Sequence, residues 1–154
     1  MEISKFDEQC MREALQQADL AAELGEVPIG AVAAVDEIVV ARAHNLREKD
    51  QNPLGHAEIL LLQALSQKYQ SWRLDNVTIY VTCEPCLMCS GAMLQARVTR
   101  VVYGCKDPKA GACGSLYDVL SDQRLNHQIT TASGVLEKEC GQKLSEFFKK
   151  LRVC

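Results

Sequence analysis

The first apolar pattern along the chain has the spacing of an α-helix. Cys10, Ala14 and Ala18 recur every four residues, and Met11 and Leu15 belong to the same apolar stripe. One apolar stripe at this spacing is typical of a helix that buries one face. The pattern predicts an amphipathic helix from about residue 5 to residue 24. Gly25 is expected to end it, because glycine readily adopts the left-handed conformation that follows many helices.

Two runs rich in β-branched residues follow this helix. Ile29–Val35 and Ile38–Ala43 are separated only by Asp36 and Glu37, a spacing that predicts a tight β-hairpin. A polar loop from Leu46 to Pro53 comes next. Three later runs have the length and composition of further strands: Val77–Val81, Val98–Tyr103 and Ile129–Ser133.

Two central segments are predicted as helices with little polar surface. Glu58–Leu65 is apolar almost all round, which indicates a helix buried on most sides. Cys86–Ala96 is also mostly small and apolar, and Pro85 fits its first turn. A short turn of helix is expected at Leu116–Leu120, and the apolar spacing from residue 136 to residue 151 predicts an amphipathic C-terminal helix.

The order of these elements, α-β-β-α-β-α-β-β-α, predicts the fold class. Helices alternate with strands, so we expect a three-layer α/β/α domain around a mixed sheet of about five strands. A chain of 154 residues is long enough for one domain, residues 1–154. No apolar run approaches the roughly 20 residues that span a bilayer, and the N-terminus lacks the pattern of a signal peptide, so we expect a cytoplasmic protein without membrane contacts.

Eight cysteines would suit a disulfide-rich scaffold, but the expected compartment keeps thiols reduced. Cys86 and Cys89 have the spacing of metal ligands. Cys83 is either a fourth ligand or, as the burial tendency of free cysteine favours, a packed core thiol. Cys154 is expected to be an exposed free thiol. The others are predicted to pack in the core: Cys10, Cys105, Cys113 and Cys140.

Four residues suggest a catalytic metal site. His56 precedes one predicted helix, and Cys86 and Cys89 lie three residues apart on another, so they can share one ion. A His and two Cys leave a tetrahedral zinc ion one open position, which is the arrangement of a catalytic site. Glu58, two residues after His56, is then placed for proton transfer. Separately these residues have ordinary interpretations: a capping histidine, a redox CxxC pair and a glutamate that complements the helix dipole.

Charge adds little to this picture. The net charge is −3, and residues 1–26 hold seven acids and two bases. The segment Arg97–Lys109 holds four bases against Asp107 alone. This segment is either a solvated surface or a local patch for a polyanion, and charge alone does not decide between them.

The order H-x-E followed by P-C-x-x-C is the known signature of zinc-dependent nucleobase deaminases, whose mechanism is established. Beyond this signature, the chain resembles the bacterial tRNA-specific adenosine deaminases, members of the cytidine deaminase superfamily, along nearly its whole length. The phrases that carry the resemblance are Glu26–Val32, Asn45, His56–Glu58, Tyr80–Thr82, Glu84–Cys86, Met88–Cys89, Gly91–Met93, Arg100–Gly104, Gly114–Leu116, Asp118–Leu120, Asn126–His127 and Phe147–Phe148. The resemblance implies a cytidine-deaminase-like fold and hydrolytic deamination of adenosine to inosine at the wobble position of a tRNA anticodon.

The resemblance also implies roles for individual residues. His56, Cys86 and Cys89 are expected to hold one Zn²⁺ per chain, and Glu58 to transfer the proton. In the family pattern, the Ala57 N–H bonds the group at C6 of the purine, Asn45 grips the purine edge and Ile29 forms a pocket wall. Asp107 and Phe148 match positions near the RNA, with Lys106, Lys109, Lys149 and Arg152. A homodimer and the ACG anticodon loop of tRNA-Arg are the implied partners.

Other functions remain open at this point. A deaminase of free guanine or cytidine would keep the zinc motif and Glu58 but would need no basic rim. A noncatalytic zinc-stabilised subunit would not need Glu58. A thiol redox protein using Cys86 and Cys89 would leave His56 and Glu58 unexplained.

Overall fold

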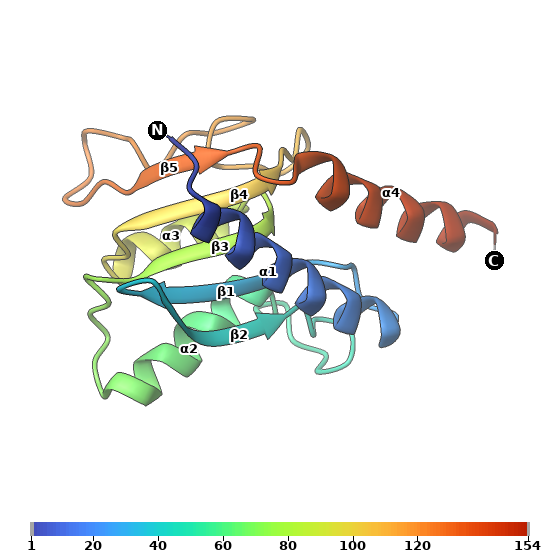
Figure 1. The fold of residues 1–154 in the computed structure, drawn as a ribbon, viewed down its shortest axis with the longest axis horizontal. Helices are drawn as coiled ribbons and strands as arrows, with labels where there is room; N and C mark the ends of the chain where they lie inside the picture. The colour runs from blue at the N-terminus through green and yellow to red at the C-terminus, as the bar shows by residue number, and fades with distance from the viewer. Residues whose placement is uncertain (1, 154) are drawn as a thin grey trace.

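The computed structural model describes residues 2–153 and confirms the predicted three-layer α/β/α architecture. Its helices are α1 (Lys5–Glu23), α2 (Ala57–Tyr69), α3 (Leu87–Gln95) and α4 (Glu137–Val153). Its strands are β1 (Gly30–Val35), β2 (Ile38–His44), β3 (Thr78–Cys83), β4 (Arg100–Cys105) and β5 (Thr130–Ser133). They form one mixed sheet in the order β2-β1-β3-β4-β5, in which β1 is antiparallel to β2 and β3 and the other pairs are parallel (Figure 1).

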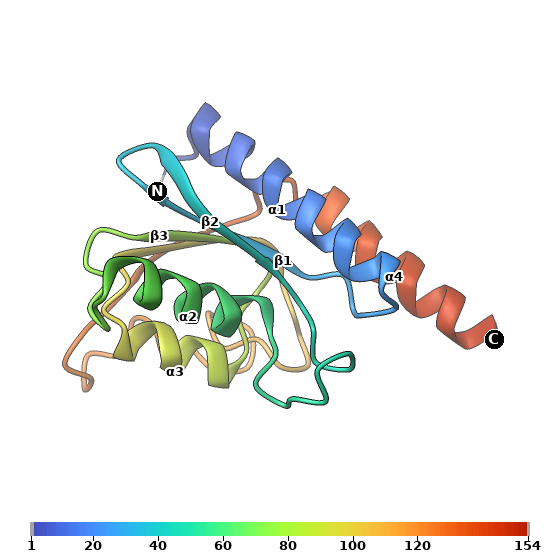
Figure 2. The same ribbon diagram turned by 90° about the horizontal axis from the view of Figure 1, so that it is seen from below.

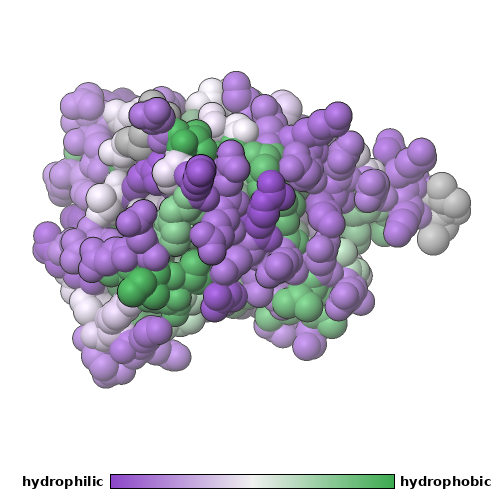
Figure 3. Space-filling view, viewed as in Figure 1, coloured by the Kyte–Doolittle hydropathy of each residue, from purple (hydrophilic) through white to green (hydrophobic). Residues whose placement is uncertain are grey.

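The helices cover the sheet in two separate layers. Figure 2 shows α2 and α3 side by side on one face and α1 and α4 on the other. Side chains along β3 point alternately to the two faces of the sheet. Ile79 and Val81 pack with the α2 and α3 residues, whereas Tyr80 packs with α1. The face that carries α1 and α4 is mostly hydrophilic on its outside (Figure 3), as expected for amphipathic helices.

Local signals at helix α1 and the hairpin are confirmed. Ser4 and Asp7 form a capping box at the start of α1, and Gly25, with φ of +77°, ends the helix. Asp36 and Glu37 both have positive φ, 50° and 59°, and join β1 to β2 as a two-residue hairpin. Such turns match the right-handed twist of the strands they connect.

The helix expected at Leu116–Leu120 does not form, and that prediction is wrong. The N–H groups of Leu116 and Tyr117 both donate to the carbonyl of Gly111, and Cys113 pairs with Asp118 in an isolated bridge. The loop therefore closes on itself rather than winding into a helix. The helix predicted from Cys86 also begins one residue later, because Cys86 has an extended conformation (ψ 177°) and caps α3.

The thiols within residues 2–153 are as expected. The cysteines described there are free, and those expected in the core are buried. Cys154 lies outside the described residues. Along the described part of the chain, no helix has both the length and the apolar character that crossing a bilayer requires.

A buried ion pair ties α1 to the sheet. The Asp7 carboxylate accepts hydrogen bonds from the Tyr80 hydroxyl at 2.8 Å and from both terminal nitrogens of Arg100 at 2.8 and 3.0 Å. Burial alone raises the pKa of Asp7. The hydrogen bonds from Arg100, the Ser4 backbone and Tyr80 outweigh burial, and the pKa lies well below its usual value.

Replacing Asp7 by Asn should lower the free energy of unfolding at pH 7 by about 2–3 kcal/mol, because Arg100 loses a charged partner. A depressed folded pKa stabilises the fold above the unfolded pKa of about 3.9, and this contribution is lost as the pH falls through the folded value. The difference between variant and parent should therefore shrink below about pH 4. Urea unfolding at pH 7 and pH 3 measures it.

Asp75→Asn is the matched control, because Asp75 pairs with Arg73 on an exposed surface. Its effect should stay below about 1 kcal/mol at both pH values. Equal effects of the two substitutions at pH 7 would contradict the importance of the buried pair.

Candidate metal centre

The start of each central helix supplies ligand atoms to one small group. His56 is the N-cap of α2 and Cys86 the N-cap of α3, while Cys89 lies in the first turn of α3. Neither residue makes a capping hydrogen bond with its side chain. Because α2 and α3 lie side by side on the sheet, their N-terminal ends meet (Figure 2).

The donor atoms of this group are close together. His56 Nδ1 lies 3.6 Å from Cys86 Sγ and 3.5 Å from Cys89 Sγ. All ligand atoms of the three residues lie within 4.8 Å of one another. With zinc bonds of about 2.3 Å to sulfur and 2.0–2.1 Å to nitrogen, a nitrogen and a sulfur ligand of a tetrahedral ion lie about 3.5–3.6 Å apart. The spacing and the chemistry of these donors fit one zinc ion.

The protonation of the group also suits a cation. The contact with Cys89 is the main cause that lowers the pKa of the Cys86 thiol. Burial raises this pKa, His56 lowers it further, and the resulting value is about 4. This shift favours the thiolate form of Cys86, the form that binds metal. The contact with Cys86 and burial raise the pKa of Cys89. A bound divalent cation deprotonates a coordinating thiol outright.

Glu58 lies beside the group, in the first turn of α2. Only 4% of its surface is exposed. Burial outweighs the opposing effects of the helix backbone and His56, and it raises the pKa of Glu58 to about 7. A carboxyl with a pKa near 7 can both accept and release a proton at neutral pH.

A cavity of about 160 Å³ opens next to Glu58 and His56. It is small beside ordinary ligand pockets of roughly 300–1,000 Å³ and suits one small flat group. Three residues that the sequence analysis assigned to a substrate pocket line it: Ile29, Asn45 and Ala57. The structure therefore brings them together with the metal-ligand group.

Asn45 is held in place by the backbone around it. Its Nδ2 donates to the carbonyl of Val27 at 3.2 Å, and its Oδ1 accepts from the N–H of Arg47 at 3.0 Å. A side-chain amide has a second N–H and a second lone pair, so these bonds fix the orientation of Asn45 without using all its capacity.

Asp107 and Phe148 are not among the residues that line this cavity. The Asp107 carboxylate accepts from the N–H groups of Lys109 and Ala110 and so closes a local turn. Phe148 is 43% exposed and packs edge-on against Phe147 in α4, a helix whose C-terminal end projects beyond the sheet (Figure 2).

Cys83 belongs to a different environment from the ligands. Its thiol is buried in the apolar cluster beneath α1 and α4, and the described donor group comprises only His56, Cys86 and Cys89. These observations favour the packing interpretation over a fourth ligand.

Two cavity-lining residues had no role assigned from the sequence: Val27, which lies within the quoted phrase Glu26–Val32, and Arg47. Arg47 stands in a polar loop two residues after Asn45, and neither periodicity nor motif distinguishes it from a solvated loop residue. Only the closure of this loop against the start of α2 places it at the cavity.

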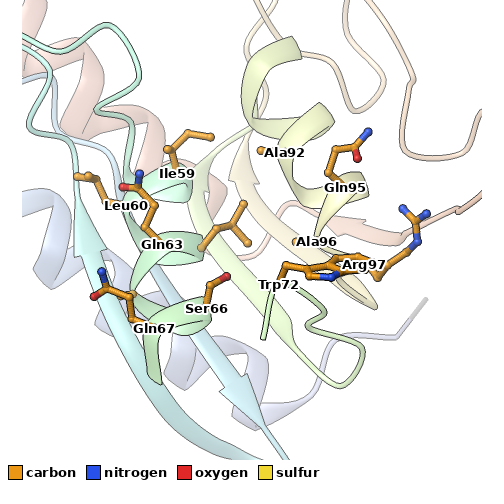
Figure 4. A pocket seen from close by; sticks show the side chains of 12 residues that line it. Ile59, Leu60, Gln63, Ser66, Gln67, Trp72, Ala92, Gln95, Ala96 and Arg97 are labelled. Carbon is orange, nitrogen blue, oxygen red and sulfur yellow. The ribbon is translucent and has the colours of Figure 1, made fainter. Parts of the chain in front are cut away.

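A larger hollow, of about 1060 Å³, lies on the outer side of α2 and α3 (Figure 4). Ile59 and Leu60 of α2 face it opposite Ala92 and Ala96 of α3, with Trp72 beside them. The all-round apolar pattern of α2 predicts burial on most sides, but in the single chain this side is partly open.

Comparison with known families and proteins relates this chain to deaminases. A model of the MafB19-like deaminase family matches residues 6–152. The chain is 50% identical over 146 residues to a tRNA-specific adenosine deaminase of Bacillus subtilis (strain 168), covering 95% of this chain and 91% of that protein. It is 47% identical over 150 residues to a protein of the same description from Haemophilus influenzae, covering 97% and 87%.

Two solved structures also resemble this chain. A structure from work on A-to-I editing by tRNA:A34 deaminases matches with a TM-score of 0.85 at 38% identity, covering 88% of this chain and 99% of that one. A guanine deaminase from Nitrosomonas europaea matches with a TM-score of 0.75 at 21% identity, covering 96% and 86%, and shares the fold.

Proposed function

Because this chain belongs to the tRNA-specific adenosine deaminases, we propose that it converts adenosine to inosine at the wobble position, position 34, of a tRNA anticodon. The reaction is hydrolytic: adenosine and water give inosine and ammonia. The observation that carries the proposal is the juxtaposition of His56, Cys86 and Cys89 with the buried Glu58 at one small cavity. Residues 1–154 act as one zinc-dependent deaminase domain in the cytoplasm.

His56, Cys86 and Cys89 are the proposed ligands of one zinc ion per chain. When bound, zinc lowers the pKa of a coordinated water toward about 7 and so provides the nucleophile. Soft thiolates with an imidazole favour zinc over magnesium or calcium, which prefer oxygen ligands.

Glu58 is the proposed proton carrier. Its carboxylate takes a first proton from the attacking water and delivers it to a ring nitrogen of the purine, where it stays in inosine. It then carries the second proton of that water to the amino group at C6, which leaves as ammonia. A pKa of about 7 suits both directions of transfer. A noncatalytic zinc subunit or a redox CxxC protein would have no use for a buried glutamate at this position.

The cavity residues hold the base in this proposal. The Ala57 N–H donates to the oxygen that the reaction adds at C6, Asn45 bonds the purine edge and Ile29 packs against the ring. An anticodon base is already unpaired, so turning it into a small cavity costs less free energy than extracting it from a duplex. Flanking nucleotides meet a rim that comprises Lys106, Asp107, Lys109, Phe148, Lys149 and Arg152.

The direct test is sequencing of an ACG anticodon stem-loop, with the sequence found in tRNA-Arg, after incubation with the zinc-loaded protein. We expect adenosine at the first anticodon position to be read as guanosine, because inosine pairs with cytidine. Free guanine and cytidine, assayed in parallel for ammonia release, should be poor substrates. Rapid turnover of either small molecule with an unchanged stem-loop would contradict the proposal.

The open side of α2 and α3 supports a homodimer. A second chain would cover the partly exposed Ile59 and Leu60 and the adjoining Trp72, an arrangement that removes apolar surface from water. We therefore expect a mass twice the 17.0 kDa of one chain in solution.

Leu60→Glu should convert the dimer to a monomer, because it places a charge within the covered surface. Sedimentation equilibrium measures the mass. Leu20→Glu is the control, since Leu20 is exposed on α1, on the other face of the sheet, and its variant should remain dimeric. A dimeric Leu60→Glu protein would assign the interface to another surface.

A further inference from the structure

Glu84 is a buried carboxylate that none of the roles above uses. It lies just before Pro85 and Cys86, and only 3% of its surface is exposed. Oε1 accepts hydrogen bonds from the N–H of Asp107 at 3.1 Å and from the hydroxyl of Ser115. Oε2 accepts from the N–H groups of Cys113 at 3.0 Å and Ser115 at 3.1 Å. Both oxygens therefore bind one loop, at its two ends.

The same loop is also attached to the metal-ligand segment. Gly111 pairs with Cys86 in an isolated bridge, and the N–H of Ala112 donates to the carbonyl of Pro85 at 2.9 Å. A Cβ at position 111 would lie 2.3 Å from Glu84 Cδ, so only glycine allows this approach. The loop from residue 106 to residue 115, which we call the anchored loop, thus wraps around the Glu84 carboxylate.

The tip of the anchored loop displays charge. Lys106 and Lys109 are exposed, whereas the Asp107 carboxylate accepts hydrogen bonds from the N–H groups of Lys109 and Ala110. Two cations therefore face solvent on a loop whose base is fixed beside Cys86. Glu84 itself does not line the cavity next to Glu58.

We propose that Glu84 is a positioning residue for RNA: its carboxylate holds the anchored loop so that Lys106 and Lys109 meet the phosphates that flank the target base. The inference rests on the proposed function. A loop that is already ordered loses little conformational entropy when RNA binds, so the free energy of binding is more favourable. Loss of the carboxylate should therefore weaken substrate binding, whereas the chemical step, which Glu84 does not touch, should be preserved.

Zinc-loaded, full-length Glu84→Gln tests this with steady-state kinetics on the ACG stem-loop. Glutamine keeps the shape, but its NH₂ group faces N–H donors and cannot accept from them. We expect KM to rise about tenfold, kcat to change by less than about threefold and zinc to stay at one per chain. Hydrogen exchange without RNA should show faster exchange at the amides of Asp107, Cys113 and Ser115.

Two further variants complete the test. Asp7→Asn removes a buried, hydrogen-bonded carboxylate on the other face of the sheet, so it should lower stability without changing KM. Ser115→Ala removes one donor to Glu84 and should raise KM in the same direction by a smaller factor, about threefold. Ser115→Ala keeps the inference testable if Glu84→Gln does not fold.

Each outcome separates the inference from the proposed function. If the parent protein deaminates the stem-loop but neither Glu84→Gln nor Ser115→Ala changes KM, the inference is overturned. It is also overturned if kcat and zinc content fall together at constant KM, because Glu84 would then support the metal site. If the parent leaves the stem-loop unchanged, the proposed function fails; unchanged hydrogen exchange would then overturn the ordering role as well.

Discussion

Glu58→Gln should lower the rate of stem-loop deamination by about 10²–10⁴-fold, the usual contribution of a positioned general acid–base group. Glutamine has nearly the volume of glutamate but cannot accept and release a proton near neutral pH. Glu58 is not in the described donor group, so zinc should stay near one per chain. Single-turnover kinetics and metal analysis of the same sample measure both quantities.

Glu8→Gln provides the matched control. Glu8 also lies in the first turn of a helix, α1, but is exposed and distant from the metal centre. Its variant should keep the parental rate. Full activity in Glu58→Gln would remove Glu58 from the mechanism and favour another proton carrier, whereas loss of zinc would assign it to the metal site.

Cys89→Ser should lose zinc and deaminase activity together. The substitution nearly preserves the size of a fully buried side chain, but a hydroxyl does not ionise to an anionic ligand at neutral pH. Since even outer-shell changes cost 10–100-fold in metal affinity, loss of one of three ligands should cost more than about 10²-fold. Chelation of the parent protein should abolish activity, and added zinc should restore the parent but not the variant.

Cys83→Ala distinguishes a fourth ligand from a core thiol. Cys83 is buried in the apolar cluster beneath α1 and α4, so its removal should lower stability modestly and leave one zinc per chain. Loss of zinc from both Cys83→Ala and Cys89→Ser would instead indicate a closed, four-ligand structural site.

The features that the sequence determined by itself are short-range ones. The spacing of Cys10, Ala14 and Ala18 specified helix α1, and Gly25 its end, because helix periodicity and capping act over a few residues. The H-x-E and P-C-x-x-C phrases placed His56 and Cys86 at helix starts for the same reason. The order of elements predicted the three-layer α/β/α domain with a mixed sheet, which the structure confirms.

Contacts between distant segments were decided only by the tertiary structure. Glu84 binds loop residues 23 to 31 positions away. Hydrogen bonds from Leu116 and Tyr117 to the carbonyl of Gly111 take the place of the helix expected at Leu116–Leu120. The partly open side of α2 and the place of Arg47 at the cavity likewise depend on how separate elements pack. Local pattern indicates which residues are apolar or able to ionise, but burial and hydrogen-bond partners are set by chain segments that meet only in the folded protein.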